Sequence, residues 1–442
     1  MTESISLSQH ALRLRAALRE FPPLLWSFLY FFFLLTGYYV LRPVRDAMGA
    51  AADVEAVFSP AMIAWFAERG IALGDFTLQA LFTGTFVCMV LLQPAYGWLV
   101  SRFRRRVFLP VVYLLFIACL AGFYVAFFRE MPGRGALFFI WVAVFNLFAV
   151  SVFWSFMADV FSNAEAKRVY GYIGAGGTLG GLTGPWLTRS LVVELGVANM
   201  MLLSIVCLAI CLVCILRLAE WARQAERTRG RSDDDAMGGR VLEGLRLIAR
   251  DPLLRALTVL MFFGVGVGTI LYNQQREIAQ LLAEDAFRTR FYSNLDLWIN
   301  LLTLVIQVFL TRRVLTNYGV GPALMIPALA VLAGFALLSA SPLPVWVAVV
   351  QIATRAGEFS LGKPARETIY TRVDRQSRYK AKAAIDTVIY RGGDLAFSWV
   401  HKGLSAFGSS VVFGGGVLIA AAMTFGAWRV VREQARLPAE SR

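Results

Sequence analysis

SLGKPARETIYTRVDRQSRYKAKAAIDTVIYRGGD, residues 360–394, is the longest strongly polar run in an otherwise apolar sequence. Its charges continue into an apolar segment that still contains Asp386, Arg391 and Asp394. An ionisable side chain is costly at the middle of a bilayer, so such residues face a protein cavity or an aqueous path. We therefore expect the rest of the chain to be a helical scaffold that builds a path around these charges.

The composition is that of an integral membrane protein. Of the 442 residues, 58% are hydrophobic and 16% are charged, against about 45–50% and about 25% in soluble domains. A helix needs about 20 apolar residues to cross the hydrocarbon core. The chain therefore has room for about a dozen spans and for no large soluble domain.

The hydrophobic runs predict an all-α membrane fold with about twelve transmembrane helices in two six-helix halves. The expected spans lie near residues 24–48, 76–100, 107–128, 136–160, 169–193, 196–219, 253–278, 291–311, 320–341, 344–362, 383–405 and 409–430. We expect residues 1–219 to form the first half and residues 241–442 the second. Residues 220–240 are polar and contain glycine, which predicts a flexible cytoplasmic linker.

Basic clusters occur in alternate loops, as the positive-inside rule requires. They are Arg102–Arg106, Lys167–Arg168, Arg223–Arg231, Arg312–Arg313, Arg372–Lys382 and Arg429–Arg436. We therefore expect a multi-pass protein of the bacterial inner membrane, in contact with the lipid bilayer and with both termini in the cytoplasm. The net charge of +14 follows this topology, so no nucleic-acid partner is expected. The first apolar run lacks a signal-peptide cleavage site, which predicts a retained N-terminal tail.

Two pairs of segments echo each other across the halves. TGYYVLRPVRDAMG (residues 36–49) and GTILYNQQREIAQL (residues 268–281) both end an apolar span with an arginine followed by an acid. AEAKRVYGYIGAGG (residues 164–177) and YKAKAAIDTVIYRGG (residues 379–393) both pass from a basic entry to a glycine pair. Such repetition is typical of transporters built from structural repeats.

Small residues recur at helical spacing in two of the apolar runs. One set is Gly174, Gly176, Gly177, Gly180, Gly181 and Gly184. Its spacing does not fit a phosphate-binding loop, and it predicts close helix packing between the halves or at the cavity wall. The other set is Cys207, Cys211 and Cys214. With apolar neighbours and no nearby histidine, these cysteines are expected to be buried packing residues and not a metal site.

Arginines inside the expected spans are the candidate anion-binding residues. They are Arg42, Arg45, Arg276 and Arg391. The guanidinium group is always ionised, and its planar fork matches phosphate and carboxylate. The alternative is that these arginines form structural or gating salt bridges with nearby acids. Because basic residues recur in the first, seventh and eleventh spans, we expect an anionic small-molecule substrate.

The loop GWLVSRFRRR, residues 97–106, resembles the G-x-x-x-D-R-x-G-R-R loop of the major facilitator superfamily. Ser101 stands at the acidic position and Arg104 at the second glycine, so the match is partial.

Three further segments resemble the nucleotide transporter family, the ATP/ADP translocases of plastids and obligate intracellular bacteria. YYVLRPVRDAM (residues 38–48) is similar to the family's L-R-x-x-K-D signature. FWSFMADVFSNAEAKRVYGYIGAGG (residues 153–177) is similar to its F-W-x-F-A-N and E-A-K-R-F-Y-P-L-F-G region. Residues 366–394 are similar to its K-E-M-A-Y-I-P-L, K-G-K-A-A-I-D and R-x-G-K-S-G run. The resemblance implies a twelve-helix carrier that exchanges nucleotides or similar phosphorylated anions.

The resemblance also marks individual residues. They are Arg42, Arg45, Asp46, Glu165, Lys167, Arg168, Tyr170, Arg366, Glu367, Tyr370, Lys380, Lys382, Asp386 and Arg391. Two departures from the family pattern matter. Arg45 replaces a lysine and keeps the charge, whereas Asp394 replaces a lysine and reverses it. The loss of a positive charge favours a less highly charged anion than a triphosphate, or a proton-coupled anion.

We therefore expect an alternating-access secondary transporter of a phosphorylated or other anionic metabolite, with a nucleotide-like substrate favoured. It would work by exchange or proton coupling, as a monomer, without a cofactor or a metal. The expected substrate-binding residues are Arg42, Arg45, Arg276, Lys382 and Arg391. The expected gating or proton-coupling residues are Asp46, Glu165, Glu277, Asp386 and Asp394.

Three alternatives remain open at this point. The chain could be a major facilitator carrier for a non-nucleotide solute, or a membrane scaffold or sensor that transports nothing. A membrane enzyme or lipid-handling protein is the third, but His10 and His401 are the only histidines. No nucleophile–base or metal-ligand cluster appears, so no catalytic residue is expected.

Overall fold

The structure, a computed structural model, describes residues 22–51, 53–102, 105–161, 163–229, 241–370, 381 and 384–436. All regular secondary structure in these ranges is helical, which confirms the all-α fold. The first half comprises α2 (Pro22–Gly49), α3 (Val54–Val57), α4 (Pro60–Ala67), the 3-10 turn η1 (Leu73–Phe76), α5 (Thr77–Arg102), α6 (Arg105–Phe128), α7 (Arg134–Val160), α8 (Asn163–Leu195) and α9 (Val197–Arg229).

The second half begins with a short helix and contains four π-helical turns. Its elements are α10 (Val241–Arg250), α11 (Pro252–Gln280), α12 (Asp285–Ile306), η2 (Gln307–Thr311), η3 (Val314–Tyr318), α13 (Val320–Ala340), α14 (Pro344–Gly357), η4 (Glu358–Gly362), α15 (Lys363–Tyr370), η5 (Ile385–Ile389), α17 (Tyr390–Ser405) and α18 (Ser409–Ala435). Two of the π-helical turns, η2 and η3, lie between α12 and α13. The turn η4 joins α14 to α15, and η5 leads into α17.

Nine helices in the described ranges are long and apolar enough to cross a membrane. The other three expected spans coincide with α8, with α14–η4 and with η5–α17. The glycine-rich α8 is less apolar, while α14 has 14 residues and α17 has 16 before the flanking turns are added. Each expected span therefore corresponds to helix. One boundary differs, because α9 continues past residue 219 to Arg229, and Ala222 packs in the core of the first half.

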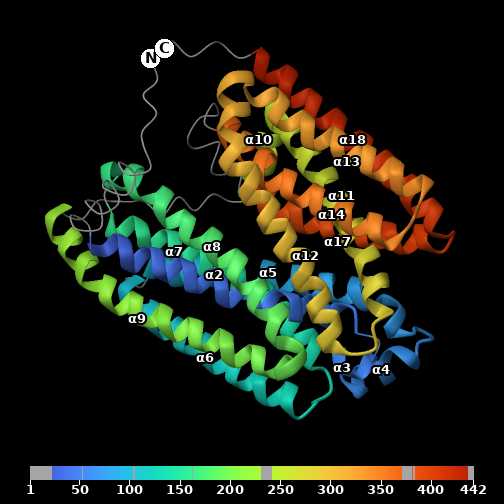
Figure 1. Cartoon of the computed structure of the whole chain (residues 1–442), viewed down its shortest axis with the longest axis horizontal. Helices are drawn as coiled ribbons and strands as arrows, with labels where there is room; N and C mark the ends of the chain where they lie inside the picture. Colours follow the sequence, from blue (N-terminus) through green and yellow to red (C-terminus); the bar gives the residue numbers. More distant parts are fainter. Residues whose placement is uncertain are drawn as a thin grey trace.

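Two separate apolar cores hold the helices together. The buried side chains of one extend from Leu24 to Ala222, and those of the other from Ile248 to Val430. The two halves lie close together near α3, α4 and the start of α12, and they separate toward the end of the molecule where α2 begins and α18 ends (Figure 1). A smaller apolar cluster joins the halves at the close end, where Ala47 of α2 and Ala50, just after this helix, meet Tyr292 and Leu295 of α12.

The glycines of α8 allow close approach to α2. A Cβ atom added at Gly176 would lie 2.7 Å from the backbone oxygen of Phe28, and one added at Gly184 would lie 2.8 Å from that of Thr36. The stripe thus packs two helices of the same half, which the sequence analysis did not anticipate. It also takes part in the predicted contact between halves, because Asn300 Nδ2 of α12 donates to the Gly181 oxygen at 2.6 Å.

The π-helical turns of α12 and α14 support each other. Gln307 Nε2 donates to the Phe359 oxygen at 3.3 Å, and Thr311 Oγ1 donates to the Ser360 oxygen at 2.8 Å. A π-helical turn leaves backbone groups without their usual helical partners, and such turns are frequent at functional sites. Here side chains from η2 satisfy the carbonyl groups of η4, directly beside the cavities described next.

Candidate functional site

Two connected cavities lie between the halves. The one nearer the end where the halves meet, called the deeper cavity, has a volume of about 300 Å³. It is lined from the first half by α2, α5 and α7, and from the second by α11, α14, η4 and α17. The wider one has a volume of about 600 Å³ and extends along α15 as far as Tyr370. Both volumes fall in the range of small-molecule sites, about 300–1,000 Å³. Arg355, Phe359, Tyr390, Arg391 and Asp394 line both cavities and connect them.

Arg42 and Arg45 enter the deeper cavity from the last turns of α2. Arg45 donates to Asp46 Oδ1 from Nε at 2.8 Å and from Nη2 at 2.6 Å. Arg42 Nη1 lies 3.1 Å from Asp296 Oδ1 of α12, and Arg42 Nε lies 3.9 Å from Asp46 Oδ2. Each of these arginines therefore has a carboxylate partner.

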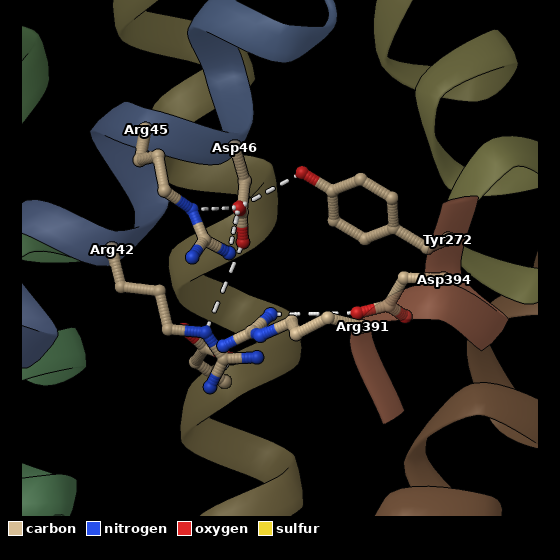
Figure 2. Close-up of polar contacts among 7 residues, drawn as sticks. Arg42, Arg45, Asp46, Tyr272, Arg391 and Asp394 are labelled. Carbon is tan, nitrogen blue, oxygen red and sulfur yellow. Dashed lines mark hydrogen bonds and ion pairs between the residues drawn. The ribbon is translucent and has the colours of Figure 1, made fainter. Parts of the chain in front are cut away.

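Asp46 and Asp296 also connect the two halves. Tyr272 of α11 donates from its hydroxyl to Asp46 Oδ1 at 2.9 Å (Figure 2). Both carboxylates are buried, each in a residue that is 3% exposed. The Tyr272–Asp46 bond and the Arg42–Asp296 pair thus cross the interface at the end where the halves lie close together.

Arg391 reaches the same cavity from α17 in the opposite half. Its Nη1 lies 3.4 Å from Asp394 Oδ2, one turn further along the helix, and Thr269 Oγ1 of α11 donates to Asp394 Oδ1 at 3.1 Å. Figure 2 shows the side chains of Arg391 and Arg42 pointing toward one another from the two halves. The predicted competition between Asp394 and a substrate for Arg391 is compatible with this long, loose pair.

Arg355 of α14 lies near the carboxylates of Asp296, Glu358 and Asp394 but forms a direct ion pair with none of them. Its guanidinium makes no hydrogen bond and no ion pair with any described residue, and its Nε is buried without a partner. A Cβ added at Gly268 of α11 would lie 3.4 Å from Arg355 Nη2, so this glycine leaves room for the side chain. A partly buried charge without a direct ion-pair partner is costly, and one that lines both cavities can be satisfied by a bound anion.

The wider cavity contains a second group of charges that the family resemblance marked in part. Arg366 of α15 donates from Nη1 to Glu358 Oε2 at 2.9 Å and from Nη2 to Glu358 Oε1. Lys363 is exposed at the same cavity wall. Glu367 and Tyr370 also line this cavity.

Arg276 and Glu277 lie outside both cavities. Tyr272 is the last residue of α11 among the lining residues, and Arg276 follows one turn later. Glu277 is exposed, accepts a hydrogen bond from Gln274 at 3.2 Å and lies 3.8 Å from His401 Nε2. The sequence echo between Arg45–Asp46 and Arg276–Glu277 therefore does not extend to the contacts that these residues make.

Three other expected site residues are placed only in part. Glu165 lies in the first turn of α8 and is half-buried. Asp386 belongs to η5, but its side chain is outside what the structure describes, and Lys382 lies outside the described residues. Neither cavity includes Glu165 among its lining residues.

Two charged residues of the site, Arg355 and Asp296, were not expected from the sequence. Both stand inside expected spans, Arg355 in residues 344–362 and Asp296 in residues 291–311. The rule that a charge within a span marks a functional site would have found them. They were overlooked because neither belongs to a repeated segment or to a family motif.

Aromatic side chains complete the deeper cavity. Tyr38, Tyr39, Phe82, Phe139, Phe359 and Tyr390 line it together with the arginines. Aromatic faces stack on planar rings, and guanidinium groups form paired hydrogen bonds with phosphate or carboxylate. The cavity can therefore hold a molecule that combines a planar ring with an anionic group.

A family model of the Major Facilitator Superfamily matches residues 47–393. ADP,ATP carrier protein 1 of Chlamydia muridarum is 22% identical over 88% of this chain and 82% of the carrier. The chloroplastic ADP,ATP carrier protein 1 of Arabidopsis thaliana is 25% identical over 57% of this chain and 45% of that protein. These similarities confirm the resemblance expected from the sequence motifs.

Solved structures share the fold. The nucleoside transporter NupG covers 94% of this chain and 98% of its own, with a TM-score of 0.58 and 14% identity. A bacterial homologue of the iron transporter ferroportin in an inward-facing state covers 94% of this chain and 99% of its own, with a TM-score of 0.60 and 10% identity. At this identity the likeness concerns architecture alone. The family match over most of the chain is decisive: this protein belongs to the Major Facilitator Superfamily and is a multi-pass membrane transporter.

Proposed function

We propose that this protein is an alternating-access secondary transporter of a phosphorylated or otherwise anionic metabolite, with a nucleotide-like substrate favoured. In this proposal the substrate occupies the deeper cavity between the halves, in contact with Arg355 and Arg391 and near Arg42 and Arg45. It follows that Arg276, although expected from the sequence to bind substrate, takes no part in binding in this conformation.

The observation that carries the proposal is the unpaired guanidinium of Arg355. The cavity that it lines also receives Arg42, Arg45 and Arg391, with Asp394 as the acid among its described lining residues. A neutral or cationic substrate would leave the Arg355 guanidinium without a direct ion-pair partner, whereas a phosphoryl or carboxylate group supplies one.

Two further observations favour a nucleotide-like molecule. The aromatic lining offers faces for a base to stack on. The ADP,ATP carrier protein 1 of Chlamydia muridarum aligns with 88% of this chain. The name of this relative supports a phosphorylated substrate.

Alternating access requires the halves to separate where they now meet. We propose that the two halves, the first of them extending to the end of α9 at Arg229, move as units about the residues between α9 and α10. The Tyr272–Asp46 and Arg42–Asp296 contacts would break when the close end opens. If both termini are cytoplasmic in the bacterial inner membrane, as the basic loops favour, the described conformation is open to the cytoplasm.

Uptake into proteoliposomes tests the proposal. Purified protein would be assayed with radiolabelled nucleosides, nucleotides, inorganic phosphate, sugar phosphates and carboxylates, with and without a preset pH gradient or an internal anion. We expect saturable uptake of an anion by the wild type and its loss in Arg355→Ala. Stimulation by internal anion would indicate exchange, and stimulation by the pH gradient would indicate proton coupling.

Arg313→Ala is the matched control, because Arg313 is exposed, lies between η2 and η3, and is absent from the lining of both cavities. It should transport like the wild type at equal amounts of reconstituted protein. Uptake of a neutral solute alone, unaffected by Arg355→Ala, would contradict the proposal and favour the non-nucleotide carrier. Absence of any flux across the panel would favour the scaffold or sensor.

A further inference from the structure

We infer that the cavity accepts a substrate with one anionic group, so that among nucleotides it selects monophosphates and disfavours di- and triphosphates. This inference rests on the proposed function and makes its substrate class specific. It comes from the way in which carboxylates already occupy the cavity's arginines.

The arginines of the deeper cavity differ in how fully they are neutralised. Arg45 donates twice to Asp46, and Arg42 lies between Asp296 and Asp46. Arg391 has Asp394 at 3.4 Å. In the wider cavity Arg366 is paired with both oxygens of Glu358.

Arg355 is therefore the one guanidinium of the deeper cavity that has no carboxylate partner among the described residues. Lys363 is also unpaired in the described part of the chain, but it is exposed at the wall of the wider cavity, where water weakens its attraction for an anion. One fixed guanidinium matches one phosphoryl or carboxylate group in a bidentate arrangement.

Additional phosphoryl groups would meet carboxylates instead of free cations. Asp394 lines both cavities beside Arg391. Glu358 lines the wider cavity and is the first residue after α14, the helix that contains Arg355. Like charges at short range in a site of low dielectric repel strongly. A second phosphoryl group near Arg355 would therefore have to displace Asp394 from Arg391 or lie against it.

The test is equilibrium binding of adenosine, AMP, ADP and ATP to the full chain in lipid nanodiscs, measured by calorimetry at fixed pH and salt. We expect AMP to bind about tenfold or more tightly than adenosine, ADP or ATP. Relative to adenosine, AMP gains a charge-assisted hydrogen bond between its phosphoryl group and Arg355. Relative to ADP and ATP, AMP avoids the repulsion between a second phosphoryl group and Asp394. Arg355→Ala should abolish the difference between AMP and adenosine.

Asp394→Asn provides the sharper comparison. It frees Arg391 and should improve ADP relative to AMP by about tenfold. Asp285→Asn is the matched control, because it frees Arg288 near the start of α12, outside the lining of both cavities. It should leave the ranking unchanged.

The outcomes separate this inference from the proposed function. Affinity that rises from AMP to ADP to ATP would overturn the inference and leave the anion transporter intact. An unchanged ADP-to-AMP ratio in Asp394→Asn would also overturn it, because the neutralisation of Arg391 would then not set selectivity. If none of the four compounds binds, or if adenosine binds as tightly as AMP, the nucleotide-like anion site falls together with the inference.

Discussion

The hydroxyl of Tyr272 offers a clean perturbation of the contact that closes one end of the transporter. Tyr272→Phe keeps the ring and its packing and removes only the 2.9 Å bond to Asp46 across the halves. Asp46 keeps its bonds from Arg45 within the same helix, so it is not left without a partner. The change therefore removes one interaction between the halves and little else.

The size of the effect follows from the charge of the acceptor. A hydrogen bond to a charged group contributes about 1.5–3 kcal/mol, and about 1.4 kcal/mol corresponds to a tenfold change in an equilibrium. Because this bond exists only while the close end is shut, its loss should shift the equilibrium about ten- to a hundredfold toward the state in which that end is open. A minor state of about 0.1% would then rise to about 1–9%, and one of about 10% to about 50–90%.

Double electron–electron resonance spectroscopy measures the distance distribution between two spin labels, and thereby the population of each state. Labels at Met131→Cys and Leu343→Cys, in a variant without the native cysteines, lie in exposed loops of different halves at the close end. We expect Tyr272→Phe to add a component at longer distance. Tyr318→Phe, at a residue that is 72% exposed, should leave the distribution unchanged. A Tyr272→Phe distribution equal to that of the wild type would refute the role of this bond in closing the interface.

Two further predictions concern packing and topology. Gly176→Ala should destabilise the protein by about 1–3 kcal/mol, because the new methyl group would lie 2.7 Å from the Phe28 oxygen. Gly174→Ala is the control, because a Cβ added there has nothing within 4 Å. Equal melting temperatures of the two variants in detergent would contradict the close α2–α8 packing. A cysteine placed between α9 and α10 should resist an impermeant thiol reagent in intact cells and react in inverted membrane vesicles, and labelling of intact cells would overturn the cytoplasmic placement of the linker.

Most of the fold could be predicted from the sequence because the bilayer restricts the choices. Backbone polar groups inside the hydrocarbon must be satisfied within the segment, so long apolar runs become helices. The runs that became α8 and α17 were predicted in the same way, although neither helix is among the nine described helices that are long and apolar enough to cross a membrane. The π-helical turns and the continuation of α9 to Arg229 were not predicted, since hydrophobic runs carry no signal for them.

The site was only partly predictable, because the role of an arginine depends on which acid lies next to it. Arg42 and Asp296 are far apart in the chain, and only the packing of α2 against α12 brings them together. Arg276 has the same charge and a similar sequence context to Arg45, yet it lies one turn beyond the cavity. Arg355, by contrast, was not predicted. It stands out because it has no ion-pair partner among the described residues, and a sequence alone does not reveal such an absence.

The most direct test of the central claim is an experimental structure of the transporter with bound AMP. We predict that the phosphoryl group lies within hydrogen-bond distance of the Arg355 guanidinium, between the two halves, with the adenine ring against the aromatic wall of the deeper cavity. A phosphoryl group bound elsewhere, with Arg355 paired to a protein carboxylate instead, would contradict it.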